Sequence, residues 1–112
     1  MSLVANKNGD TLVLSVESTR IDSASAIAFK DEMFNATRGT QGRVILDLTK
    51  VDFVDSSGLG AIVASMKALG DAAKMDIAGL SPVVEKVFRL TRMDSVFRIF
   101  PDLPSAQTAT PA

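Results

Sequence analysis

The chain has 112 residues, of which 46% are hydrophobic and 22% are charged, and its formal net charge at pH 7 is −1. A chain of this length forms about one domain with one modest core, and its weak charge argues against nucleic acid as a direct partner, because binding phosphates requires a basic face. The sequence contains no histidine and no cysteine, which excludes a Ser-His-Asp triad, a Cys-His dyad and the usual zinc sites. We therefore expect a regulatory protein rather than an enzyme, with no metal and no cofactor, although paired carboxylates can still do acid–base chemistry.

The sequence lacks the marks of export and of membrane insertion. No apolar run is long enough to span a bilayer, and residues 1–10 lack the basic-then-apolar layout of a signal peptide. We expect a cytoplasmic protein that makes no membrane contact and is monomeric on its own.

The N-terminal third predicts a hairpin followed by a helix. Asn8-Gly9 between extended segments is a strong hairpin signal, and residues 12–16 alternate with the period of a strand. Asp22 or Ser23 can cap the helix that follows. The apolar residues of this helix recur at helical spacing, and they are Ala26, Phe29, Met33 and Ala36.

The middle of the chain predicts a buried strand and a second helix. Residues 43–48 form a nearly continuous apolar run, which is typical of a central parallel strand covered on both faces. A loop then leads to a helix that begins near Ser56 or Ser57 and ends at Gly70. The apolar stripe of this helix comprises Leu59, Ile62, Val63, Met66 and Leu69.

The C-terminal part predicts two strands around a third helix. One strand is expected at residues 75–78 and another at 96–100, and Ser81-Pro82 supplies the N-cap and the first residue of the helix between them. Pro, Ser, Thr and Ala dominate residues 101–112, for which we expect a disordered tail.

The order of these elements indicates one α/β domain over residues 1–100. Strands that alternate with helices are joined by right-handed crossovers and pair in parallel. We therefore expect a mixed, mostly parallel sheet with the N-terminal hairpin at its antiparallel edge, and three main helices of which most lie on one face.

Residues 55–60, Asp-Ser-Ser-Gly-Leu-Gly, stand where the second helix begins. The first amides of a helix have no intrahelical partner and carry about half a positive charge, so a phosphate on a serine hydroxyl there would face exposed N–H groups. Gly58 removes a side chain, so that the backbone can approach a ligand or a partner closely. The same residues also form an ordinary cap, in which Asp55 or Ser56 accepts hydrogen bonds from the amides behind it, and spacing alone favours that cap.

The residues around this segment also match a known family. Residues 51–60, Val-Asp-Phe-Val-Asp-Ser-Ser-Gly-Leu-Gly, strongly resemble the signature of STAS-domain anti-sigma-factor antagonists, the bacterial anti-anti-sigma factors. The resemblance covers most of residues 4–100 and includes the pair Ile21-Asp22, which matches a Leu-Asp pair of the family. It implies a STAS fold for residues 1–100.

The resemblance also implies a partner switch. Ser56 would be phosphorylated by a partner that is both an anti-sigma factor and a serine kinase, the unphosphorylated protein would bind this partner and free sigma, and a separate serine phosphatase would reset the switch. The resemblance therefore favours Ser56 as the phosphosite over a mere cap. The chain departs from the family pattern at Thr19 and Arg20, where many members have Gly and Glu.

The predicted partner surface surrounds Ser56. Its members are Asp22, Asp55, Ser57, Gly58, Gly60, Ala61, Ala64 and Lys67. A simpler interpretation exists for each of them: the two aspartates and Ser57 can be caps or neighbours of caps. The small residues can form a solvated helix face rather than a strip that another helix approaches.

Two other functions stay open. A STAS subunit of a stressosome-like or membrane-transport assembly would share the fold but not the kinase partner. An enzyme or a nucleotide-binding domain rests only on the glycines and on scattered aspartates. Gly58-Leu59-Gly60 lacks the third glycine of a dinucleotide fingerprint and the lysine of a P-loop.

Overall fold

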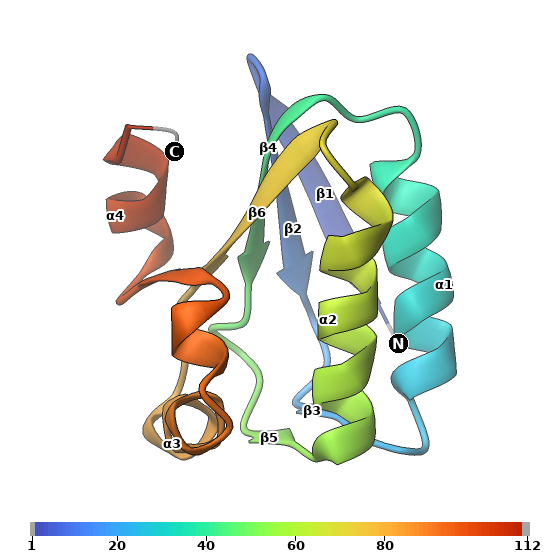
Figure 1. Cartoon of the computed structure of the whole chain (residues 1–112), viewed down its shortest axis with the longest axis vertical. Coiled ribbons are helices and arrows are strands. Elements are labelled where there is room, and N and C mark those ends of the chain that lie inside the picture. Colours follow the sequence, from blue (N-terminus) through green and yellow to red (C-terminus); the bar gives the residue numbers. More distant parts are fainter. Residues whose placement is uncertain (1, 111–112) are drawn as a thin grey trace.

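The computed structural model describes residues 2–110, in which a five-stranded sheet carries helices on both faces (Figure 1). Its strands are β1 (Leu3–Asn8), β2 (Thr11–Val16), β4 (Gly42–Asp47), β6 (Ala73–Ala78) and β7 (Arg98–Phe100). The helices are α1 (Ala26–Thr37), α2 (Ser56–Leu69), α3 (Pro82–Leu90) and α4 (Leu103–Thr108), with a 3-10 turn η1 (Met93–Ser95). Two further short strands, β3 (Arg20–Ile21) and β5 (Phe53–Val54), pair separately.

The sheet has the order β1-β2-β4-β6-β7, with β1 antiparallel to β2 and the other neighbours parallel. The pairing of Asn8 with Thr11 leaves Gly9 and Asp10 as a two-residue turn. Gly9 has a φ of 58°, in the left-handed region that such a hairpin turn requires. The expected mixed, mostly parallel α/β fold with an N-terminal hairpin at the sheet edge is confirmed.

The central strand β4 is covered on both faces, as its apolar sequence predicts. Val44 and Leu46 are fully buried in the main core beneath α1 and α2. Ile45 points to the other face and joins a second buried cluster with Val13 of β2 and Ala106 of α4. One strand therefore supports two apolar layers.

The three predicted helices bury the stripes that the sequence indicates. Phe29 and Met33 of α1 and Ile62 of α2 are fully buried in the main core. The third helix begins at Pro82, and the Oγ of Ser81 accepts the N–H of Val84 at 3.4 Å, as the N-cap prediction requires. Among residues 2–110 no helix is long and apolar enough to cross a membrane.

The structure differs from the predicted disordered tail at residues 103–108, which form α4. The Oδ1 of Asp102 caps this helix by accepting the N–H of Ser105 at 2.8 Å. Ala106 is fully buried, and its carbonyl accepts a hydrogen bond from the Nη1 of Arg43 at 2.6 Å. The helix escapes detection because six residues with one buried alanine carry no periodic apolar pattern. Residues 111–112 of the predicted tail, and residue 1 of the predicted domain, lie outside the described residues.

A buried ion pair lies beneath α4. Arg43 and Asp76 are each only 4% exposed, and the Nε of Arg43 donates to the Oδ2 of Asp76 at 2.7 Å. The Nη2 of Arg98 donates to the same oxygen at 2.9 Å. The guanidinium of Arg43 also lies over the ring of Phe100, 5.7 Å from its centroid. Asp76 therefore compensates a buried cation that also anchors the last helix.

The short strands β3 and β5 pair in parallel, with Arg20 opposite Phe53 and Ile21 opposite Val54. The sequence predicts no strand at either place, because two-residue strands are too short to show a period. Their pairing brings the segment that follows β3 next to the segment that follows β5. Both segments reach the end of the molecule at which α2 begins (Figure 1).

Candidate functional site

Asp55 organises the start of α2. Its backbone is extended, with φ −97° and ψ −175°, and its Oδ1 accepts the N–H of Gly58 at 2.9 Å. The first backbone bond of the helix runs from the N–H of Leu59 to the carbonyl of Asp55 at 2.9 Å. Asp55 is therefore the N-cap, which makes Ser56 the first residue of the helix.

The second oxygen of Asp55 joins two loops that are far apart in the sequence. Its Oδ2 accepts the N–H of Ser23 at 3.0 Å, which ties the segment before α1 to the start of α2. A carboxylate that accepts one backbone N–H on each oxygen is held in a fixed orientation. Sequence spacing gave no sign of this link, because it depends on the pairing of β3 with β5.

Asp22 lies in the same segment and is half-buried. Its Oδ1 accepts the N–H of Ala24 at 3.1 Å and the Oγ–H of Ser25 at 3.2 Å, and its Oδ2 accepts from the Nε of Arg20 at 3.1 Å. The hydrogen bond from Arg20 is the largest of the causes that hold the pKa of Asp22 below its ordinary value. The carboxylate is therefore fully ionised at neutral pH.

The predicted cap of α1 is corrected by this geometry. The helix begins at Ala26, and its N-cap is Ser25, whose side chain makes no capping bond. Asp22 instead stabilises a turn before the helix by accepting the N–H of Ala24. The N–H of Ser23 donates to Asp55 and not to a cap of α1. Asp22 thus shapes the loop beside Ser56 and does not cap the helix.

Gly58 faces the interior rather than a partner. A Cβ added there would lie 1.9 Å from the carbonyl oxygen of Ile21, so the missing side chain makes room for the protein's own backbone. The expectation that this glycine lets a ligand or a partner approach is wrong, because Gly58 is buried against β3. The close contact instead sets the distance between α2 and the segment of Asp22.

Ser56 and Ser57 are both exposed at the start of α2. Asp55 takes the N–H of Gly58, and within residues 2–110 the N–H groups of Ser56 and Ser57 make no hydrogen bond. Two free amides and two hydroxyls therefore face solvent at the positive end of the helix dipole.

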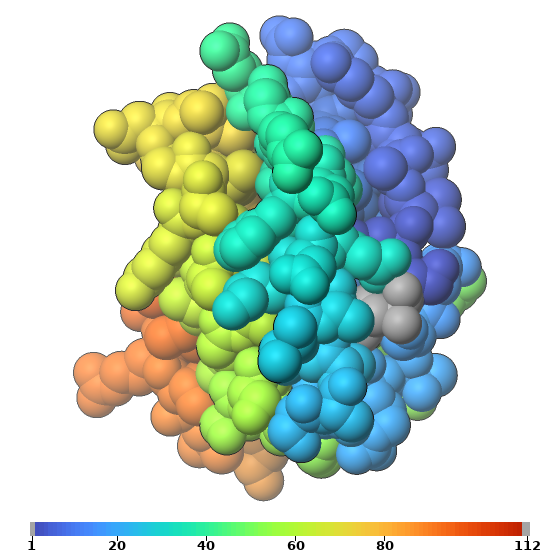
Figure 2. Space-filling model, turned by 90° about the vertical axis from the view of Figure 1, so that its right-hand side faces the viewer, coloured from blue at the N-terminus to red at the C-terminus, as the bar shows by residue number. Residues whose placement is uncertain are grey.

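A shallow groove of about 210 Å³ runs beside these serines, between α1 and α2. It is lined by Ser57, Gly60, Ala61 and Ala64 of α2 and by Ala26, Ile27 and Lys30 of α1. Ala61 is only 6% exposed and forms part of the floor, whereas Ile27 is 73% exposed. Lys67 is exposed but does not line the groove. Figure 2 shows α1 and α2 side by side on this face.

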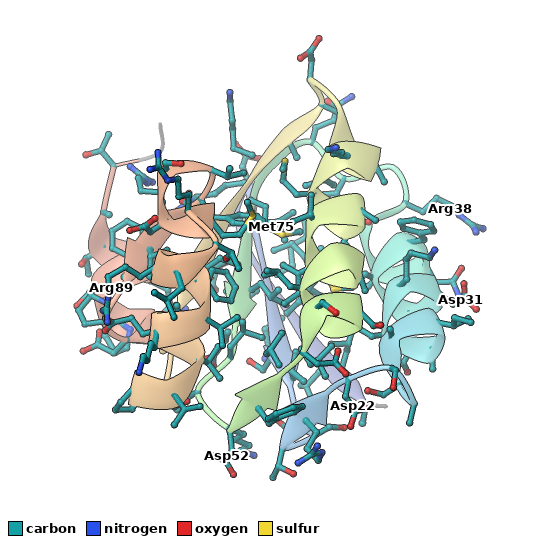
Figure 3. All side chains as sticks on the ribbon, turned by 60° about the horizontal axis from the view of Figure 1, so that its bottom comes forward. Asp22, Asp31, Arg38, Asp52, Met75 and Arg89 are labelled. Carbon is teal, nitrogen blue, oxygen red and sulfur yellow. The ribbon has the colours of Figure 1, made fainter. Side chains whose placement is uncertain are left out.

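The structure places the predicted site residues in different parts of this region. Ser56 and Asp22 lie at the end of the molecule where α2 begins, and the labelled Asp22 and Asp52 mark this end in Figure 3. Of the predicted strip, Gly60, Ala61 and Ala64 line the groove, and Lys67 lies outside it. Gly58 is internal. Within residues 2–110 no group of three or more acidic side chains is arranged to hold a metal ion.

The fold and this site agree with a known family. The model of the STAS domain family matches residues 2–106. The chain belongs to the STAS domain family. A curated relative, the anti-sigma-F factor antagonist RsfB of Mycobacterium tuberculosis, is 29% identical over 105 residues, which cover 94% of this chain and 84% of the relative.

Solved STAS structures resemble the chain closely. The crystal structure of an anti-sigma factor antagonist from Mycobacterium paratuberculosis has a TM-score of 0.86 and 25% identity, and the match covers 96% of this chain and 91% of that one. The murine anion transporter Slc26a9 has a TM-score of 0.79 and 16% identity, over 91% of this chain and 18% of the transporter. At that identity the transporter shows the shared STAS fold alone.

Proposed function

We propose that this STAS domain is an anti-sigma-factor antagonist that binds an anti-sigma factor with serine kinase activity and is released when Ser56 is phosphorylated. The observation that carries the proposal is the position of Ser56, an exposed first residue of α2 whose N–H is free and whose neighbour Ser57 lines the groove. The similarity to named anti-sigma factor antagonists supports the choice of partner.

The unphosphorylated surface suits close packing against a protein. Gly60 and Ala64 are small and leave the groove open, and the exposed Ile27 offers apolar area beside it. The free N–H groups of Ser56 and Ser57 can donate to carbonyl or carboxylate oxygens of the partner. Asp22 and Ser57 complete the proposed contact surface, and Lys67 extends it along α2.

A phosphate on Ser56 would add about −1.5 to −2 charges at this surface. The neighbouring carboxylate of Asp55 is held on both oxygens by backbone N–H groups, so it stays beside the new charge. Burying the phosphate in a closely packed interface costs free energy of desolvation, and any partner carboxylate nearby is repelled. The partner is therefore released, and a serine phosphatase restores binding in the cytoplasm, where we place the protein.

The proposal predicts a single phosphate on Ser56. We expect incubation with the anti-sigma factor kinases of the same organism, ATP and Mg²⁺ to give one phosphate per chain, located on Ser56 by mass spectrometry. Ser56→Ala should abolish the modification, and Ser57→Ala should retain it, although Ser57 is an equally exposed neighbour on the same turn. A phosphate on Ser57 alone, or on any residue away from α2, would contradict the proposal.

A further inference from the structure

The side chain of Arg20 is exposed yet held in place. It is 57% exposed, and its guanidinium lies over the ring of Phe53, 4.2 Å from the centroid. Its Nε donates to the Oδ2 of Asp22 at 3.1 Å. An aromatic face below and a carboxylate at one edge together fix the guanidinium plane, so much of the rotamer entropy that binding normally costs is already lost.

The outer edge of this guanidinium is free. An arginine side chain carries five N–H donors, and Arg20 uses only the one on Nε within residues 2–110. The four donors on Nη1 and Nη2 form the fork that binds a carboxylate with two parallel hydrogen bonds. The geometry therefore leaves this fork available to bind a carboxylate with two hydrogen bonds.

The fold places this site beside the proposed phosphosite. Arg20 pairs with Phe53 in the β3–β5 register, and Phe53 precedes Ser56 by three residues. Ser23, three residues after Arg20, is hydrogen-bonded to Asp55. Arg20 and Ser56 therefore lie at the same end of the molecule.

Several acidic groups surround Arg20. Asp22 and Asp55 lie in the adjoining segments, and Figure 3 shows Asp52 at the same end. These acidic groups disfavour a partner carboxylate directly beside them, whereas the guanidinium fork accepts one. Charge arrangements of this kind determine how two proteins align and which partner is bound more than they determine overall affinity.

We infer that Arg20 selects the partner by binding one of its Asp or Glu side chains through the free Nη1–Nη2 fork. The inference rests on the proposed function and deepens it, because Arg20 and Ser56 lie at the same end of the molecule, where a partner carboxylate held at Arg20 would experience the charge that Ser56 would carry. A phosphate on Ser56 would repel that carboxylate, which gives release an electrostatic cause in addition to desolvation.

The test compares the affinity of charge variants for the anti-sigma factor that binds the unphosphorylated wild type. We expect Arg20→Gln to weaken binding about tenfold and Arg20→Glu about a hundredfold, with Arg20→Lys recovering only part of the affinity, because lysine lacks the fork. Arg38→Glu is the control, since it makes the same charge change at an exposed residue towards the other end of α1 (Figure 3). All variants should melt within about 3 °C of wild type, since exposed ion pairs contribute little to stability.

A reciprocal exchange identifies the partner residue. One Asp→Lys or Glu→Lys change in the anti-sigma factor should restore binding to Arg20→Glu and weaken binding to the wild type.

Equal affinity of Arg20→Glu and wild type for the anti-sigma factor would overturn the inference and leave the proposed function standing. If Arg20→Gln binds the anti-sigma factor normally but is no longer released by phosphorylation, the fork binds the phosphate on Ser56 and not a partner carboxylate. That result would also overturn the inference. Binding that depends on Arg20 but not on a phosphate at Ser56 would keep the inference and overturn the proposed gating, and failure of the wild type to bind any anti-sigma factor would overturn both.

Discussion

Replacing Gly58 by alanine is expected to lower the free energy of unfolding by about 3 kcal/mol. The new Cβ would lie 1.9 Å from the carbonyl oxygen of Ile21 and 2.6 Å from its carbonyl carbon. Both are backbone atoms and cannot rotate away, so α2 and β3 must separate. The separation would also strain the hydrogen bond between Ser23 and Asp55 that orders the site. Denaturant unfolding followed by circular dichroism measures the change.

Gly60 provides the matched control, because it lies in the same helix and a Cβ added there meets nothing within 4 Å. Gly60→Ala should raise the free energy of unfolding by about 0.5–1 kcal/mol, since alanine is the better helix former. The same substitution two residues apart is thus expected to have opposite signs. Gly58→Ala and Gly60→Ala with equal stabilities would show that α2 does not rest on β3 as described.

Removing the carboxylate of Asp76 is expected to cost about 3–5 kcal/mol, because Asp76→Ala leaves the buried Arg43 without a counter-ion. Arg43 is also the donor that holds the carbonyl of Ala106 in α4, so the last helix should loosen together with the ion pair. Thermal and denaturant unfolding give the loss, and amide hydrogen exchange in residues 103–108 reports on α4.

Two further variants show whether burial of the charge is the cause. Asp71 is exposed after α2, and Asp71→Ala should change stability by no more than about 0.5 kcal/mol. Replacing Arg43 and Asp76 together by leucine should recover part of the loss, because the uncompensated charge of Arg43 is then absent but the carbonyl of Ala106 also loses its donor. Equal stabilities of Asp76→Ala and Asp71→Ala would contradict the described ion pair.

The elements with strong apolar periods are those that the sequence predicts well. Phe29 and Met33 identify the inner face of α1, and the continuous apolar run in β4 predicts that this strand is buried on both faces. Hydrophobic spacing determines these elements directly, because each buries a stripe or a face that is visible in the sequence. The N-terminal hairpin follows in the same way from local turn chemistry.

The parts that escape prediction depend on contacts between distant residues. The link from Asp55 to Ser23 needs the two-residue strands β3 and β5 to pair first, and neither strand is long enough to show a period. The role of Gly58 also depends on the backbone of Ile21 lying against it. The contacts of α4 include the buried Ala106, the partly buried Leu103 and the hydrogen bond from Arg43, so its order depends on tertiary contacts rather than on local pattern.

The central claim is that a phosphate on Ser56 controls partner binding, and calorimetry of defined phosphoforms tests it most directly. Phosphoserine can be incorporated at position 56 during synthesis, and at the exposed Ser95 of η1 as a control for added charge. We expect the anti-sigma factor to bind the unmodified chain, Ser56→Ala and the chain with phosphoserine at 95 with similar Kd values. It should bind the chain with phosphoserine at 56 at least a hundredfold more weakly, a difference of about 2.7 kcal/mol. Equal Kd values for the phosphoserine-56 chain and the unmodified chain would contradict the claim.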